Sequence, residues 1–134
     1  MAKRSDCPIS NVLDLVGDKW SLLILRDLLF FAKKSYSDLQ NSDEKVASNI
    51  LSSRLEKLEM DGLISKQQDE KDKRKKIYTL TEKGIDMLPI LLEMILWSAK
   101  YSPDTNIPLA LVTKASNDRD GLLEELRKRI SIGD

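Results

Sequence analysis

Few residues in this 134-residue chain can do covalent chemistry, since it has no histidine and a single cysteine, Cys7. Without histidine, neither a Ser-His-Asp nor a Cys-His nucleophile can form, and no imidazole is available to bind a metal. One cysteine allows no internal disulfide and no zinc knuckle. The motifs also assemble no pair of carboxylates for acid–base work. We therefore expect a protein that is not an enzyme, with no catalytic residue, metal site or cofactor.

The polar chemistry that remains lies in two stretches. The first is one face of an amphipathic segment, and it carries short hydroxyl and amide groups together with basic side chains: Ser48, Asn49, Ser52, Ser53, Arg54 and Lys57. Such groups can reach base edges in a DNA groove. The second is the basic run Lys73, Arg74, Lys75 and Lys76, which suits phosphate contacts. Taken singly, surface serines and a charged run are more often solvated than bound. Their order along the chain carries the interpretation.

Hydrophobic periodicity predicts helices before the first stretch. Residues 8–31 are helical by pattern, with one interruption, after which Asp18 is a suitable N-cap for a second helix. A short helix within residues 33–41 would be capped by Ser35 or Ser37.

The serine-bearing helix and a hairpin come next. Apolar residues at steps of three to five predict a helix over residues 43–61, and Gly62 suits its end. Two short strands then flank a polar tip over residues 69–76. Because no Asn-Gly or Asp-Gly fixes a tight turn, we expect this tip to be long and mobile.

A long helix is predicted from Glu82 to about Tyr101, capped by Thr81 and bent near Pro89. More than half of its circumference is apolar, which exceeds what one small domain can cover and favours a partner subunit. Several large side chains are interpreted as core filling, although the two tryptophans could instead line a ligand pocket: Trp20, Trp97, Met60, Met87 and Met94.

The chain continues beyond this helix. After a proline-containing linker, Asp118 or Asp120 could cap a last helix, whose apolar stripe is Leu122, Leu126 and Ile130. We hypothesise that this stripe packs on a dimer seam. The expected organisation is a domain over residues 1–101 for DNA binding and dimerisation, and a helical extension over residues 102–134.

The order helix, helix, short helix, amphipathic helix, hairpin, long helix is typical of a winged helix-turn-helix, a mainly α fold with a small β-hairpin wing. The sequence also resembles the HxlR-type bacterial transcription regulators, a winged helix-turn-helix family related to the MarR group. Five blocks in order carry the resemblance: CPI from Cys7, GDKWSLLILRDL from Gly17, YSDL from Tyr36, LSSRLEKLEMDGLI from Leu51 and YTLTEKG from Tyr78.

The resemblance implies a homodimer that binds double-stranded operator DNA and represses or activates nearby genes. The first helix and the long C-terminal helix would form the dimer contact. Ser48, Asn49, Ser52 and Ser53 fall where groove-facing residues lie, Arg54 falls on the family's recurrent R-L step, and Lys73, Arg74 and Lys75 match the wing tip. Two recognition helices should meet successive major grooves about 34 Å apart, which implies a palindromic site.

Cys7 matches an N-terminal Cys-Pro step that thiol-sensing members of the family use to respond to quinones, aldehydes or hypochlorite. Lys3 and Arg4 lie nearby, and Pro8 suggests a helix N-terminus, both of which favour a reactive thiolate. The alternative is a half-buried structural cysteine at the dimer seam. A switch would need a bond between two subunits, a mixed disulfide with a small thiol, or alkylation.

Overall charge balances, with 22 basic and 22 acidic residues. The charges are uneven, because residues 66–83 hold seven basic and four acidic residues, a local charge of +3. We therefore expect weak non-specific DNA affinity and a local basic strip. The neutral balance and the acidic residues in the tip leave a second interpretation open, a winged-helix module that binds proteins and not DNA. No apolar run approaches the roughly 20 residues that span a bilayer, so we expect a cytoplasmic protein without a membrane partner.

Overall fold

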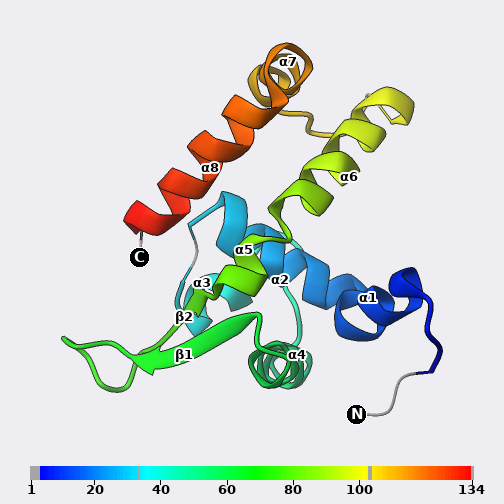
Figure 1. The fold of residues 1–134 in the computed structure, drawn as a ribbon. Coiled ribbons are helices and arrows are strands. Elements are labelled where there is room, and N and C mark those ends of the chain that lie inside the picture. Colours follow the sequence, from blue (N-terminus) through cyan, green and yellow to red (C-terminus); the bar gives the residue numbers. More distant parts are fainter. Residues whose placement is uncertain (1–3, 33, 103, 134) are drawn as a thin grey trace. The chain divides into compact units, whose positions relative to one another are not determined.

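A computed structural model describes residues 4–32, 34–102 and 104–133 of the chain (Figure 1). These residues include helices α1 to α8 and one β-hairpin. The chain divides into two compact units, residues 1–84 and residues 85–134, and each is described by itself. The mainly α fold with a β-hairpin wing is confirmed.

The first two helices follow the sequence-based prediction closely. Helix α1 covers Pro8–Val16 and α2 covers Lys19–Phe30. Asp18 is the N-cap of α2, because its side chain accepts a hydrogen bond from the Ser21 amide at 3.0 Å. Helix α2 carries much of the core of its unit, with Leu25 completely buried.

Helices α3 (Tyr36–Gln40) and α4 (Ser48–Met60) form the helix-turn-helix pair with the turn between them. Ser35 caps α3 through a reciprocal capping box with Asp38. The prediction of one helix over residues 43–61 is wrong at its start, because α4 begins only at Ser48. Lys45 has φ +47°, a left-handed conformation that a right-handed helix cannot contain.

The wing is an antiparallel hairpin of β1 (Ile64–Gln68) and β2 (Lys76–Leu80), with Ile64 paired to Leu80. Its tip extends beyond the helices of its unit (Figure 1). The Tyr78 amide donates to the Lys34 carbonyl at 2.7 Å, which ties β2 to the residues just before α3. Wing and helix-turn-helix therefore form one frame.

The predicted helix from Glu82 to Tyr101 is two helices, α5 (Glu82–Ile85) and α6 (Leu88–Tyr101). Thr81 does cap the first, since its hydroxyl oxygen accepts from the Gly84 amide at 3.2 Å. Pro89 does not bend a continuous helix. It lies in the first turn of α6. Inside a helix, proline would remove a hydrogen bond and its ring would clash with the carbonyl four residues earlier, but in the first turn neither cost applies.

The second unit contains α6, α7 (Leu109–Asn117) and α8 (Arg119–Gly133). The α8 stripe of Leu122, Leu126 and Ile130 is buried. Asp118 precedes α8, and its side chain accepts a hydrogen bond from the Gly121 amide at 3.0 Å. Of the two predicted caps, Asp118 and Asp120, it is therefore Asp118 that caps α8. The boundary after Gly84 places α6 in the same unit as α7 and α8. The predicted division between residues 101 and 102 is a division by function, and it stays a prediction.

Three side chains interpreted as core lie on the surface instead. Met60 is 79% exposed, Met94 50% and Trp97 67%. Met87 is buried as expected, and Trp20 is half-buried. Periodicity identifies an apolar face correctly, but it does not say whether the face is covered by the same chain.

Candidate nucleic-acid interface

Helix α4 separates an apolar face from a polar one. Leu51, Leu55 and Leu58 are at most 2% exposed and anchor it in the core. The four short polar residues of the opposite face are all exposed: Ser48, Asn49, Ser52 and Ser53. The amphipathic pattern thus places the predicted groove-facing residues together on solvent-facing helix surface, at the N-terminal half of the helix.

Arg54 has a role within the fold that the sequence did not reveal. Its Nε donates to Asp18 Oδ1 at 3.0 Å, and its Nη1 donates to Ser53 Oγ at 3.2 Å. The guanidinium therefore links α4 to the N-cap of α2. With its side chain one-third exposed, Arg54 also reaches the surface beside the polar face.

Asp18 is the centre of this link. Burial alone would raise the pKa of its carboxyl group, but hydrogen bonds from the Ser21 side chain and amide, followed by the bond and charge of Arg54, outweigh burial and lower the pKa below its ordinary value. Asp18 is consequently ionised in the folded protein, and it fixes both the start of α2 and the position of α4.

Lys57 is likewise engaged inside the unit. Its Nζ donates to the carbonyl oxygens of Asp14 at 2.8 Å and Leu15 at 3.1 Å, and it pairs with Asp61 at 2.7 Å. These carbonyls belong to the last turn of α1, where a cation is favourable. Two of these bonds hold Lys57 against α1 and the third is to the C-cap of its own helix. A DNA contact by Lys57 stays a prediction.

Tyr36 is a residue of this surface that sequence reasoning missed. Its hydroxyl donates to the Ser48 carbonyl at 3.1 Å and lies 3.0 Å from Ser52 Oγ. It thereby joins α3 to the polar face of α4. The sequence signals were its place as the first residue of the YSDL block and its position directly after the cap of α3.

The wing tip presents its basic side chains to solvent but combines them with acidic ones. Lys73, Arg74 and Lys75 are all exposed, and the Arg74 side chain is 93% exposed. Arg74 pairs with Asp72 at 3.2 Å, while the backbone of Lys75 closes a turn with Asp72 and bonds Asp69. The tip is therefore a turn closed by backbone hydrogen bonds, with net positive charge, and its expected mobility stays a prediction.

Cys7 lies apart from this surface, exposed at the N-cap of α1 with Pro8 behind it. The predicted helix N-terminus is confirmed. Arg4, expected to support the thiolate, instead pairs with Asp14 at 2.6 Å and donates to Ser10. Lys3 lies outside the described residues. Cys7 itself accepts an amide hydrogen bond from Asn11 through its carbonyl.

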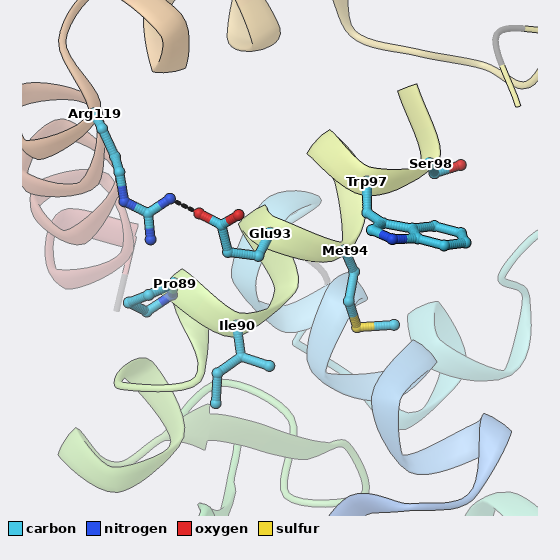
Figure 2. Close-up of a pocket in the computed structure, with 7 residues that line it drawn as sticks. All are labelled: Pro89, Ile90, Glu93, Met94, Trp97, Ser98 and Arg119. Carbon is cyan, nitrogen blue, oxygen red and sulfur yellow. Dashed lines mark ion pairs between the residues drawn. The ribbon is translucent and has the colours of Figure 1, made fainter. Parts of the chain in front are cut away.

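The second unit has an open hollow of about 740 Å³ along α6, lined by Ile90, Met94 and Trp97. Figure 2 shows these side chains along α6, with Arg119 reaching from α8 to pair with Glu93 at the edge. Elsewhere in the described ranges, no cluster of three metal-ligating side chains is found, and no helix is long and apolar enough to cross a membrane.

The chain is similar to known helix-turn-helix proteins. The model of the HxlR-like helix-turn-helix family covers residues 15–106. YdeP of Bacillus subtilis strain 168, an uncharacterised HTH-type transcriptional regulator, is 33% identical over 95 residues, 71% of this chain and 73% of YdeP. Cys7 lies outside the residues that the family model matches.

Two solved structures extend the comparison. PA1607, a proposed transcription factor, aligns with a TM-score of 0.68 and 34% identity over 75% of this chain and 68% of its own. The redox regulator HypR in its oxidised form aligns with a TM-score of 0.59 and 28% identity over 70% of this chain and 96% of its own.

Proposed function

The chain belongs to the HxlR-like helix-turn-helix family of transcriptional regulators, and from that premise we propose that it binds a palindromic operator as a homodimer. Helix α4 enters the major groove and the wing contacts the backbone. The regulators it resembles are not enzymes, and this chain works by occupancy of DNA.

One observation carries the proposal, the polar face of α4. This face carries four exposed short groups that allow the helix to approach base edges closely: Ser48, Asn49, Ser52 and Ser53. The exposed Lys73, Arg74 and Lys75 of the adjoining wing supply the phosphate contacts.

The dimer rests on apolar faces that each unit leaves uncovered. On α1, Ile9 is 71% exposed and Leu13 54%. On α6, Trp97 is 67% exposed and Tyr101 60%. Contiguous apolar surface of this kind marks an interaction site, and a two-fold dimer would present two α4 helices to successive grooves about 34 Å apart.

A salt titration tests DNA binding. In fluorescence anisotropy with a labelled operator fragment, affinity should fall steeply with salt, because each neutralised phosphate adds about −0.9 to the slope of log K against log salt. The operator search begins with the DNA upstream of the chain's own gene. A flat salt dependence, or equal affinity for all duplexes, would contradict the proposal.

A specific contact favours a second candidate, a winged-helix module that binds proteins. Asp72 pairs with Arg74 in the tip and offsets part of its charge. Under this alternative the exposed tip binds a partner protein of mixed charge, and the chain binds no DNA duplex at low salt. The same titration therefore distinguishes the two.

A thiol response at Cys7 is the finer part of the proposal. The sulfur is exposed at a helix N-terminus, and a structural relative, HypR, is a redox regulator. The Cys7 thiolate would add to a ring carbon of a quinone, forming a carbon–sulfur bond while a ring C=C π bond opens and a quinone oxygen takes up a proton. Wild type should then release its operator on quinone addition, whereas Cys7→Ser should bind equally and not respond. Release by both proteins would refute the role.

We also propose that residues 102–134 enlarge the dimer contact. The hypothesis that the stripe of Leu122, Leu126 and Ile130 packs on the dimer seam is wrong, because the stripe is already buried in the single chain. The contribution would come from the surfaces that α7 and α8 add to α6. Deletion of residues 103–134 should weaken the dimer in sedimentation equilibrium. An equally stable dimer would refute this role.

A further inference from the structure

We propose that Tyr36 sets the hydrogen-bond polarity of Ser52, so that Ser52 offers DNA only an acceptor and selects an amino-bearing base. This inference rests on the proposed function and specifies it, because it says which base chemistry the α4 surface reads at one position. Tyr36 is a positioning residue here, since it acts through Ser52.

The geometry assigns the protons. Tyr36 has one hydroxyl proton and lies within hydrogen-bond distance of two oxygens, the Ser48 carbonyl at 3.1 Å and Ser52 Oγ at 3.0 Å. A carbonyl oxygen can only accept, so the Tyr36 proton is donated to Ser48. Both bonds then form together only if Ser52 donates its own proton to the Tyr36 oxygen.

Ser52 is left with lone pairs alone to offer. Its side chain is exposed on the polar face of α4. In the major groove the hydrogen-bond donors are the amino groups of adenine (N6) and cytosine (N4), whereas guanine and thymine present oxygen at the corresponding positions. An acceptor therefore distinguishes amino from keto bases on the strand it faces, regardless of whether the base is a purine.

The frame around Tyr36 is rigid enough to hold this polarity. Tyr36 is the first residue of α3 and lies between Ser35 and Asp38, the two residues of the capping box, and Ser35 is bridged to Ile77 of the wing. Tyr36 is half-buried, and its contacts with the Ser48 carbonyl and Ser52 Oγ hold the hydroxyl beside the polar face of α4. Ordering of the Ser52 hydroxyl before DNA arrives lowers the entropy cost of the contact.

Ser53, one position along, provides the contrast. Its Oγ accepts a hydrogen bond from Arg54 Nη1 at 3.2 Å, so its proton stays available. Ser53 can consequently donate or accept. It should show no amino preference, and Ser53→Ala is the matched control for Ser52→Ala, with the same chemical change on the neighbouring residue.

The first experiment selects duplexes from a randomised library with the full chain as wild type, Tyr36→Phe, Ser52→Ala and Ser53→Ala. For wild type we expect one position in each half-site at which adenine or cytosine is preferred on one strand by about fivefold, the value of one neutral hydrogen bond. Tyr36→Phe and Ser52→Ala should lose this preference and keep the rest of the site. Ser53→Ala should retain it.

The second experiment removes the amino group itself. Replacement of the selected adenine by purine, or cytosine by 2-pyrimidinone, should weaken wild-type binding about fivefold and leave Ser52→Ala unchanged. This test does not depend on the folding of Tyr36→Phe. An amino preference that survives Tyr36→Phe, or a base change felt equally by Ser52→Ala, would overturn the inference with operator binding intact. If wild type enriches no duplex, the proposed function fails as well.

Discussion

Replacement of Asp18 by alanine should loosen the frame that positions α4. One carboxylate accepts hydrogen bonds from the Ser21 amide at 3.0 Å, the Ser21 hydroxyl at 2.7 Å and Arg54 Nε at 3.0 Å. Asp18→Ala removes all three hydrogen bonds at once. It therefore affects the start of α2 and the bond from α2 to α4 in a single substitution.

The magnitude follows from the environment of each bond. Loss of an N-cap costs about 1 kcal/mol. Ser21 is completely buried, and a buried hydroxyl that loses its partner costs about 1 kcal/mol more. The Arg54 pair is about one-third exposed on both sides, so we assign it only about 0.5 kcal/mol. Asp18→Ala should thus lower the free energy of unfolding by about 2.5 kcal/mol.

Urea unfolding followed by far-UV circular dichroism, at pH 7 and one fixed protein concentration, measures this change. Asp18→Asn is the matched control, because an amide oxygen still caps α2 while the charge is lost. It should cost about 1 kcal/mol. Equal destabilisation by both substitutions would refute the capping argument, and a loss below about 1 kcal/mol in Asp18→Ala would refute the network.

The pH dependence gives an independent check. Because the pKa of Asp18 is lower in the folded protein than its ordinary value of 3.8, its contribution is present above about pH 3.8 and is lost as the pH falls through the folded pKa. The stability difference between wild type and Asp18→Asn should shrink over that range. A difference that grows on acidification would contradict the assignment.

Lys57→Met, which keeps the stem but removes the ammonium from the α1 carbonyls, should lower the free energy of unfolding by about 1–2 kcal/mol in urea. Lys66→Met, at an exposed position of β1, should change it by less than about 0.5 kcal/mol. Gly84→Ala should cost about 1–3 kcal/mol, because an added Cβ would lie 2.1 Å from the Leu63 carbonyl oxygen; a neutral result would mean that the helix can shift. Lys75→Ala should weaken binding to all duplexes alike and reduce the salt slope by about one in anisotropy titrations; a change in sequence preference would contradict a phosphate role. Trp97→Glu should shift sedimentation equilibrium toward monomer at unchanged helix content, and an intact dimer would exclude α6 from the interface.

Local features of this fold could be predicted because their causes are local. Asp18, Ser35 and Gly62 act on backbone groups within a few residues, so side-chain type and spacing suffice to place them. The four-residue polar face of α4 follows for the same reason, since a helix turns by a constant angle per residue.

The boundaries that failed depend on backbone conformations that side-chain pattern does not report. The apolar spacing of residues 43–61 begins at Val46, yet the positive φ of Lys45 and the extended backbone of Ala47 delay α4 to Ser48. Pro89 could bend a helix or begin one, and the break after Ile85 decides for the latter. Trp97 belongs to an apolar face as predicted, but that face lies in solvent.

The sequence by itself determined which residue types were available. The absence of histidine and the solitary cysteine excluded His-based catalysis, and the ordered polar stretches indicated a winged helix-turn-helix. Only the tertiary structure decided their partners. Arg54 meets Asp18 across 36 positions, Lys57 meets the end of α1 across 42 and 43, and Tyr36 meets Ser52 across 16. Such pairs arise when the buried leucines of α4 pack it into the core beside α1, α2 and α3. Packing brings distant side chains together by geometry that no short-range spacing encodes.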